Sequence, residues 1–294
     1  MSIVGNLVGR SVKLFVRDKT TVFFACMSVL ILIGLYFLFI AKIYVENLSG
    51  LDNSAAYFLV YSQVMAGVVV LNAFSFSVSF YGKVAEDFKR GRLSAFSLTQ
   101  AKPRQILVAY VLSGFLVPVI FNLIMWILAL VLMGILTGYV LPIATILLSL
   151  AVIVVVSLIS SALMFLITVF VKEPAAMGAI SGGGGAILGF LCGVYTPYSQ
   201  LGRGVEILGS ALPFSHLTIW LKIIVSSGAM TTLGITDSVT RDAILTNFSA
   251  NSIGFLGINM PLSATIFISV VIVAMCFLAS WVILKRRIAR RVRS

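Results

Sequence analysis

Six long apolar segments constrain the fold of this 294-residue chain more than any other feature of its sequence. A helix needs about 20 apolar residues to cross the hydrocarbon core of a membrane, and each segment meets that length. Only 10% of the residues are charged, against about 25% in soluble domains, so one aqueous core could not bury all the apolar residues. The sequence therefore predicts a single all-α membrane domain over residues 1–294 with six transmembrane helices. The predicted spans cover residues 20–41, 55–80, 105–136, 140–171, 174–195 and 261–284.

Basic residues are distributed unevenly between the two sides of these spans. Most of the 21 lysines and arginines lie before the first span, between the second and third spans, or after the sixth. The other side holds Lys42, Arg203, Lys222 and Arg241. Positively charged loops remain in the cytoplasm, so we expect a multi-pass protein of the cell membrane with both termini cytoplasmic. This topology accounts for the net charge of +12 without a nucleic-acid partner.

The first 19 residues have the pattern of an amphipathic helix. Val4, Val8, Val12 and Phe15 recur at helical spacing, whereas Arg10, Lys13 and Arg17 share another face. Such a helix lies along the membrane interface, with its basic face toward anionic lipid headgroups. The alternative is a solvated leader without a membrane contact.

The segment 196–260, after the fifth span, is expected on the outer side. Residues 215–225 are apolar and aromatic but too few to span, and Pro197 and Pro213 interrupt the chain around them. We expect short re-entrant helices here, which are tolerated at membrane depth when they pack against protein. Residues 226–259 are predicted to be an exposed loop.

Signatures of catalysis and ion coupling are missing from the sequence. It contains no P-loop, because no lysine follows the four glycines at 182–185; these glycines indicate close helix packing or a helix break. His216 is the single histidine, and the three cysteines form no CxxC pair, so metal sites and hydrolytic triads are disfavoured. No charge lies in the middle of a predicted span, which argues against a proton- or ion-coupled carrier.

The polar segment 81–104 separates the second span from the third. Glu86 and Arg90 are four residues apart and can pair on a helix, while Lys102 and Pro103 break the chain before the third span. A helix here would be either a solvated connector or a docking site for a soluble partner.

Several motifs occur in the order that is typical of one transporter family. Arg17-Asp18 precedes the first span, the charged segment 86–91 follows the second, and Lys102-Pro103-Arg104 opens the third. Cys192-Gly193 ends the fifth span four residues before Pro197, and Leu212-Pro213 precedes His216. With these motifs the chain resembles the ABC-2 type permeases, the membrane subunits of ABC exporters. It departs from the family pattern at Cys192, where serine is usual, and at Arg92-Leu93, where Gly-Thr is common.

The resemblance implies a partner that hydrolyses ATP. Segment 81–104 would contain the coupling helix that docks on a separate ABC ATPase subunit, present in two copies and holding ATP and Mg²⁺; no cofactor is expected in this chain. A second permease half, either an identical copy or a paralogue, would complete the transporter. The expected ATPase-coupling residues are Glu86, Asp87, Phe88, Lys89, Arg90 and Arg92, with Lys172 and Glu173 as a second contact.

Four polar residues within the spans are candidates to line a transport path between the two halves. They are Asn72, Ser75, Ser79 and Asn122. Alternatively, these side chains satisfy backbone groups or join neighbouring helices. A path with few charges suits an amphipathic cargo, such as a peptide antibiotic, a drug or a lipid-linked glycan. The competing functions are an ATP-independent carrier or channel and a membrane-embedded enzyme.

Overall fold

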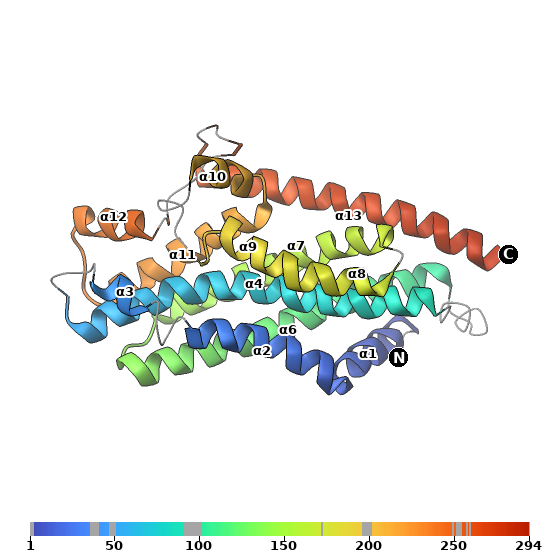
Figure 1. Ribbon diagram of the computed structural model, residues 1–294, viewed down its shortest axis with the longest axis horizontal. Coiled ribbons are helices and arrows are strands. Elements are labelled where there is room, and N and C mark those ends of the chain that lie inside the picture. Colours follow the sequence, from blue (N-terminus) through green and yellow to red (C-terminus); the bar gives the residue numbers. More distant parts are fainter. Residues whose placement is uncertain are drawn as a thin grey trace.

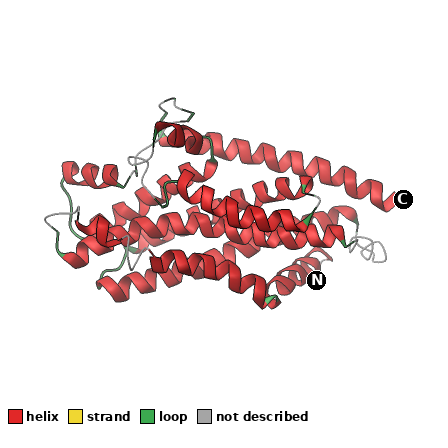
Figure 2. Cartoon of the chain, in the orientation of Figure 1, coloured by secondary structure: helices red, strands yellow, loops and turns green. Residues whose placement is uncertain are grey.

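The structure is a computed structural model of the chain, and every regular element among the residues it describes is a helix. It describes residues 3–35, 41–46, 51–90, 102–171, 173–195, 202–248, 250, 255–256, 258 and 260–293. Over these residues Figure 2 shows helices joined by short loops, and the one extended pairing links Phe255 and Ile258. The helices form an elongated bundle, and both chain termini lie at the same end of it (Figure 1). We call this the terminal end of the bundle.

Four long helices form most of the bundle. They are α4 (Asn53–Lys89), α6 (Pro103–Thr137), α7 (Ile143–Phe170) and α13 (Leu262–Arg293). Each has a stretch long and apolar enough to cross a membrane. The shorter elements are α1 (Ile3–Arg17), α2 (Lys19–Leu35), α3 (Ala41–Glu46), α8 (Pro174–Ala179), the π-helical turn η2 (Ile180–Gly184), α9 (Gly185–Leu191), α10 (Arg203–Ser210), α11 (Pro213–Thr232) and α12 (Ser238–Asn247).

Helix α4 lies at the centre of the bundle. Helices α2, α6, α7 and α11 all pack against it, and most of its side chains are buried. A helix that is apolar around its whole circumference needs such surroundings. Asp52 begins α4, because its side chain accepts a hydrogen bond from the Ser54 N–H as an N-cap.

The predicted spans correspond to helices, although the six-span layout stays a prediction. Helices α4, α6, α7 and α13 coincide with the second, third, fourth and sixth spans. The first span corresponds to α2, of which 17 residues are described. The fifth corresponds to α8, η2 and α9, which follow one another without a gap. The described residues therefore contain four helices that satisfy the length and composition of a span, and a fifth if α10 and α11 count as one broken span.

The segment after α9 contains two helices where short re-entrant ones were expected, but it differs from the prediction in extent. Helices α10 and α11 meet at an angle of 97°, a geometry that fits either a broken span or a re-entrant pair. The prediction of an exposed loop from residue 226 is wrong, because α11 continues to Thr232 and α12 follows it. Ser226 and Ala229 are fully buried. Small side chains allow this burial: Gly228 lies so close to Thr145 of α7 that a β-carbon would collide with it.

A second correction concerns the end of the second span. The sequence placed the start of a separate polar segment at Tyr81, but α4 continues without a break to Lys89. Tyr81 is fully buried, and its hydroxyl lies 3.0 Å from the Ser161 hydroxyl. Packing of this tyrosine against α7 keeps the helix intact beyond the apolar stretch. Arg92 lies outside the described residues.

Helix α1 occurs where the amphipathic pattern predicts it. The Phe15 side chain of α1 is buried between α4 and α6. The centroid of its ring lies 6.0 Å from that of the Phe80 ring and 5.8 Å from that of the Phe121 ring. The apolar face of α1 therefore packs at least partly against the bundle. Arg10, Lys13 and Arg17 are exposed, which leaves their expected contact with lipid headgroups a prediction.

Candidate functional site

A groove of about 490 Å³ lies between α2, α4 and the η2–α9 segment. Five serine and threonine side chains line it, from all three walls: Thr20, Thr21, Ser75, Ser79 and Ser181. The other lining residues are apolar or glycine, namely Phe24, Ala25, Val68, Leu71, Gly182, Gly185 and Ala186, together with Tyr195. The groove thus combines an apolar surface with scattered hydroxyls, which suits a ligand that has both kinds of surface.

The two serines stand out on the wall that α4 provides. Between Phe58 and Tyr81 every residue of α4 is buried except Ser75 and Ser79, which are partly exposed. They are four residues apart and so occupy one face of the helix. The structure therefore brings together two of the four residues expected to line a path.

The other two candidates lie elsewhere. Asn72 and Asn122 are fully buried in the contact between α4 and α6. The Asn72 amide nitrogen donates a 3.0 Å hydrogen bond to the Asn122 amide oxygen. They do not line the groove, and this arrangement matches the alternative in which the polar side chains join neighbouring helices.

The glycine run forms the wall opposite α4. It adopts the π-helical turn η2, and a β-carbon on Gly184 would lie 3.2 Å from the Phe74 ring of α4. Gly182 and Gly185 face open space in the groove. The run therefore shows both features that the sequence offered as alternatives: close packing on one side and a local departure from α-helical geometry.

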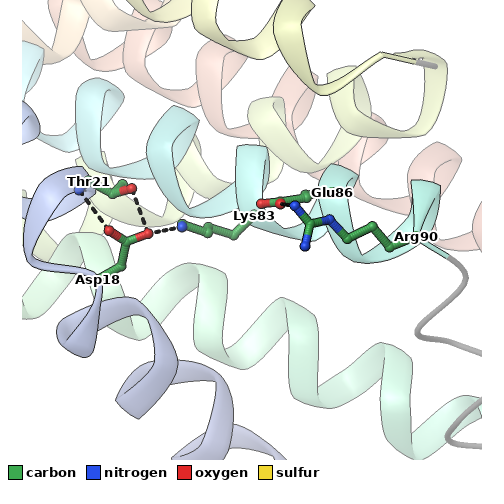
Figure 3. A network of polar contacts seen from close by, with 5 residues as sticks. All are labelled: Asp18, Thr21, Lys83, Glu86 and Arg90. Atoms are coloured by element: carbon green, nitrogen blue, oxygen red, sulfur yellow. Dashed lines mark hydrogen bonds and ion pairs between the residues drawn. The ribbon is translucent and has the colours of Figure 1, made fainter.

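At the terminal end, Asp18 joins three elements through its carboxylate. One oxygen accepts a 3.0 Å hydrogen bond from the Thr21 N–H, so Asp18 caps α2. The other accepts from the Thr21 hydroxyl and forms an ion pair with Lys83 of α4. Figure 3 shows Asp18 at the turn between α1 and α2, with Lys83 reaching it from the neighbouring helix. This geometry gives a physical reason for an aspartate before the first span.

Beyond Lys83, the last turns of α4 carry the predicted coupling residues. Glu86 and Arg90 form the expected ion pair, at 2.6 Å, along the exposed side of the helix (Figure 3). Lys89 pairs with Glu173, the residue before α8, so these two predicted contacts form one surface. Lys172 lies outside the described residues.

Asp87 and Phe88 point toward α6 rather than outward. The Asp87 carboxylate accepts a hydrogen bond of 3.1 Å from the Tyr110 hydroxyl, and the Phe88 ring meets the Tyr110 ring edge-on at 5.9 Å. These contacts fix the end of α4 to α6. A cleft of about 200 Å³ beside them is lined by α1, α4 and α6, and includes Arg10, Asp18 and Glu86.

Sequence reasoning missed the importance of Lys222. It was assigned to the outer segment as one of four basic residues, but the structure buries it in α11, with 6% of its surface exposed. The available signal was a single lysine inside an apolar, aromatic stretch.

Comparison with known families supports a transport function. Residues 4–225 match the family described as ABC-2 type transporter, which is well over half of the chain. No functionally curated protein matches it. Members of this family are membrane permeases that generally lack an ATPase site and work with an ABC ATPase subunit. The chain therefore belongs to the ABC-2 type transporter family, as its motifs predict.

Proposed function

We propose that the chain is the permease subunit of an ATP-driven exporter that moves an amphipathic substrate out of the cytoplasm. The observation that carries the proposal is the groove between α2, α4 and the η2–α9 segment. Its apolar walls and scattered hydroxyls suit a peptide antibiotic, a drug or a lipid-linked glycan. In this reading Ser75 and Ser79 face the substrate.

A second permease half covers the open side of the groove. Hydroxyl groups facing lipid lack the partners that water would supply, and this is unfavourable. Gly178, Gly182 and Ala186 are exposed at four-residue spacing along the same wall, and small residues at this spacing allow helices to approach closely. We infer that an identical copy packs here, so that two grooves enclose one path.

The ATPase subunits dock at the terminal end, on the surface formed by Glu86, Lys89, Arg90 and Glu173. From this surface a movement reaches the groove along α4. Ser79 lies ten residues before Lys89, or about 15 Å along an α-helix, and no break separates them. A push on Lys89 or Arg90 would therefore displace Ser75 and Ser79 directly.

Co-purification tests the docking surface. The double variant Glu86→Ala with Arg90→Ala should lose an ABC ATPase subunit that accompanies the wild-type chain from its native membrane and is identified by its P-loop. The matched control, Arg203→Ala with Glu206→Ala, removes the same two side-chain types from α10 and should keep the subunit. Equal recovery with both double variants would refute the docking surface.

Transport tests the function itself. Proteoliposomes that contain the chain and its ATPase subunit should accumulate substrate only with hydrolysable ATP, and Ser75→Trp should reduce this transport by narrowing the groove. Transport by the purified chain without ATP would overturn the proposal in favour of an ATP-independent carrier.

A further inference from the structure

The Lys222 ammonium is buried without a carboxylate partner among the described residues. It lies on α11, and no Asp or Glu oxygen in the described part of the chain forms an ion pair with it. A buried charge is strongly destabilising unless polar groups compensate it. The groups that compensate Lys222 therefore indicate its role.

Two main-chain carbonyls accept hydrogen bonds from Lys222. Its Nζ lies 2.7 Å from the Gly193 oxygen and 3.3 Å from the Phe248 oxygen. Gly193 follows Cys192, the C-cap of α9, and Phe248 is the C-cap of α12. Helix C-termini carry partial negative charge, which stabilises a nearby cation. The ammonium thus interacts with two helix C-termini instead of a carboxylate, and it links α9 and α12 to α11.

The end of α9 is shaped to present its carbonyl. Gly193 has a φ of +62°, which favours glycine. The Val194 N–H donates to the Gly189 oxygen at 3.0 Å, and the Gly193 N–H donates to the Phe190 oxygen at 3.1 Å. These two bonds form a Schellman motif, which satisfies the last carbonyls of the helix and leaves the Gly193 carbonyl to Lys222.

A third polar group lines the same cavity as Lys222. An ammonium has three donors, and the carbonyls use two. Gln63 of α4 is 98% buried; its Nε2 donates to the Ser226 hydroxyl, while its Oε1 has no donor among the described residues. Lys222, Gln63, Gly193 and Phe248 line a cavity of about 20 Å³. That volume holds one water molecule, which can accept from the ammonium and donate to Gln63 Oε1.

This cluster lies next to the groove, along α4. Val64 lines the small cavity, and Val68, one turn further along the helix, lines the groove. Val194 separates the two spaces, because it packs so closely on Gly67 that a β-carbon there would collide with it. Tyr195, the next residue, lines the groove itself. Residues 193–195 therefore close the end of the groove that is remote from the terminal end.

We propose that Lys222 is a latch for this end of the groove. Its bonds to Gly193 and Phe248, with one water shared with Gln63, hold residues 193–195 closed against α4. Release of the ammonium frees Val194 from Gly67 and opens the groove to the outer side. The proposal rests on the groove being the transport path, but the latch can be tested without transport.

Cys192 reports on the latch, because it is fully buried and adjoins Gly193. In a background with Cys26→Ala and Cys276→Ala, maleimide labelling of the purified, detergent-solubilised chain measures how often this segment opens. Lys222→Met keeps the apolar stem but removes the ammonium and should accelerate labelling about tenfold or more, since hydrogen bonds to charged groups are among the stronger ones. Gln63→Met should give a smaller increase through loss of the water. Lys42→Met, at an exposed lysine on α3, is the matched control and should leave the rate unchanged.

An unchanged labelling rate in Lys222→Met would overturn the latch, whatever the chain transports. Faster labelling together with ATP-independent transport would keep the latch and reject the proposed function. If Lys222→Met does not fold, amide hydrogen exchange of the unaltered chain tests the latch instead. The latch requires the segment around Gly193 and the end of α12 to open with the same free energy, and independent opening would refute it.

Discussion

Substitutions at Asp18 separate its two roles, as a helix cap and as an ion-pair partner. Asp18→Asn keeps an oxygen that can accept from the Thr21 N–H but removes the charge that pairs with Lys83. The pair is partly exposed, with 37% of the Lys83 side chain and 27% of the Asp18 side chain accessible. Partly exposed pairs contribute about 0.2–1 kcal/mol, so we expect Asp18→Asn to lower the free energy of unfolding by that amount.

Asp18→Ala removes both roles and should cost more. An N-cap contributes about 1 kcal/mol, which brings the expected loss to about 1–2 kcal/mol. Lys83→Met removes the ion pair alone and should match Asp18→Asn. Reversible unfolding in mixed micelles of SDS and a mild detergent, followed by tryptophan fluorescence, measures these differences.

A double-mutant cycle with Asp18→Asn and Lys83→Met isolates the ion pair. The coupling free energy should be about 0.2–1 kcal/mol. A coupling of zero would show that the contact drawn in Figure 3 contributes nothing to the bundle. Equal losses for Asp18→Asn and Asp18→Ala would instead refute the capping role.

Three further perturbations test other contacts of the fold. Phe15→Ala should lower the unfolding free energy by about 3–5 kcal/mol in the same micelles, because it empties a buried aromatic site; a loss below 1 kcal/mol would mean that α1 is not anchored there. Gly193→Ala should destabilise the chain by about 1 kcal/mol because of its positive φ, whereas Gly204→Ala, which meets no neighbour within 4 Å, should not. The pKa of Asp237 is lowered by hydrogen bonds from Thr240. The carboxylate therefore stabilises the start of α12 fully above the ordinary aspartate pKa, and this stabilisation is lost as the pH falls through the lowered pKa of the folded state. Amide exchange in α12, corrected for its intrinsic rate, should therefore accelerate in acid in the wild type but not in Asp237→Asn.

The sequence predicts the long helices because their signal is local. Apolar stretches of span length are visible without knowledge of any neighbour, and so is the i, i+4 spacing of Glu86 and Arg90. The end of α4 is different, since the charges at Lys83 and Glu86 suggest a polar segment that is separate from the span. Tertiary contacts of Tyr81 and Phe88 hold this part of the chain in the helix, and no local pattern shows them.

The burial of α11 is the larger error of the sequence-based prediction, and its cause is also a set of tertiary contacts. Ser226, Ser227 and Gly228 read as loop residues because they are small and polar. In the bundle their size is what allows α11 to approach α7, while Ser226 pairs with Gln63. Lys222 is therefore buried, and main-chain carbonyls compensate its charge. A sequence does not reveal such carbonyl contacts. The groove was predictable only in part, since Ser75 and Ser79 share a face with Asn72 and only the packing of α6 decides which of them is covered.

The two walls of the groove differ in stiffness, and this difference predicts where they move. The α4 wall is continuous, whereas the opposite wall contains the π-helical turn η2 with its run of glycines. Gly182 and Gly183 meet nothing within 4 Å, so alanine fits at either position and should stabilise the wall by about 0.4–1 kcal/mol, through reduced freedom of the unfolded chain and better helix propensity. If this wall bends during transport, Gly182→Ala with Gly183→Ala should slow ATP-driven transport while leaving ATPase binding intact. Gly204→Ala, which meets equally open space in the regular helix α10 away from the groove, serves as the control. Unchanged transport in the double variant, alongside the expected gain in stability, would show that the groove opens without bending at η2 and that the walls move as rigid bodies.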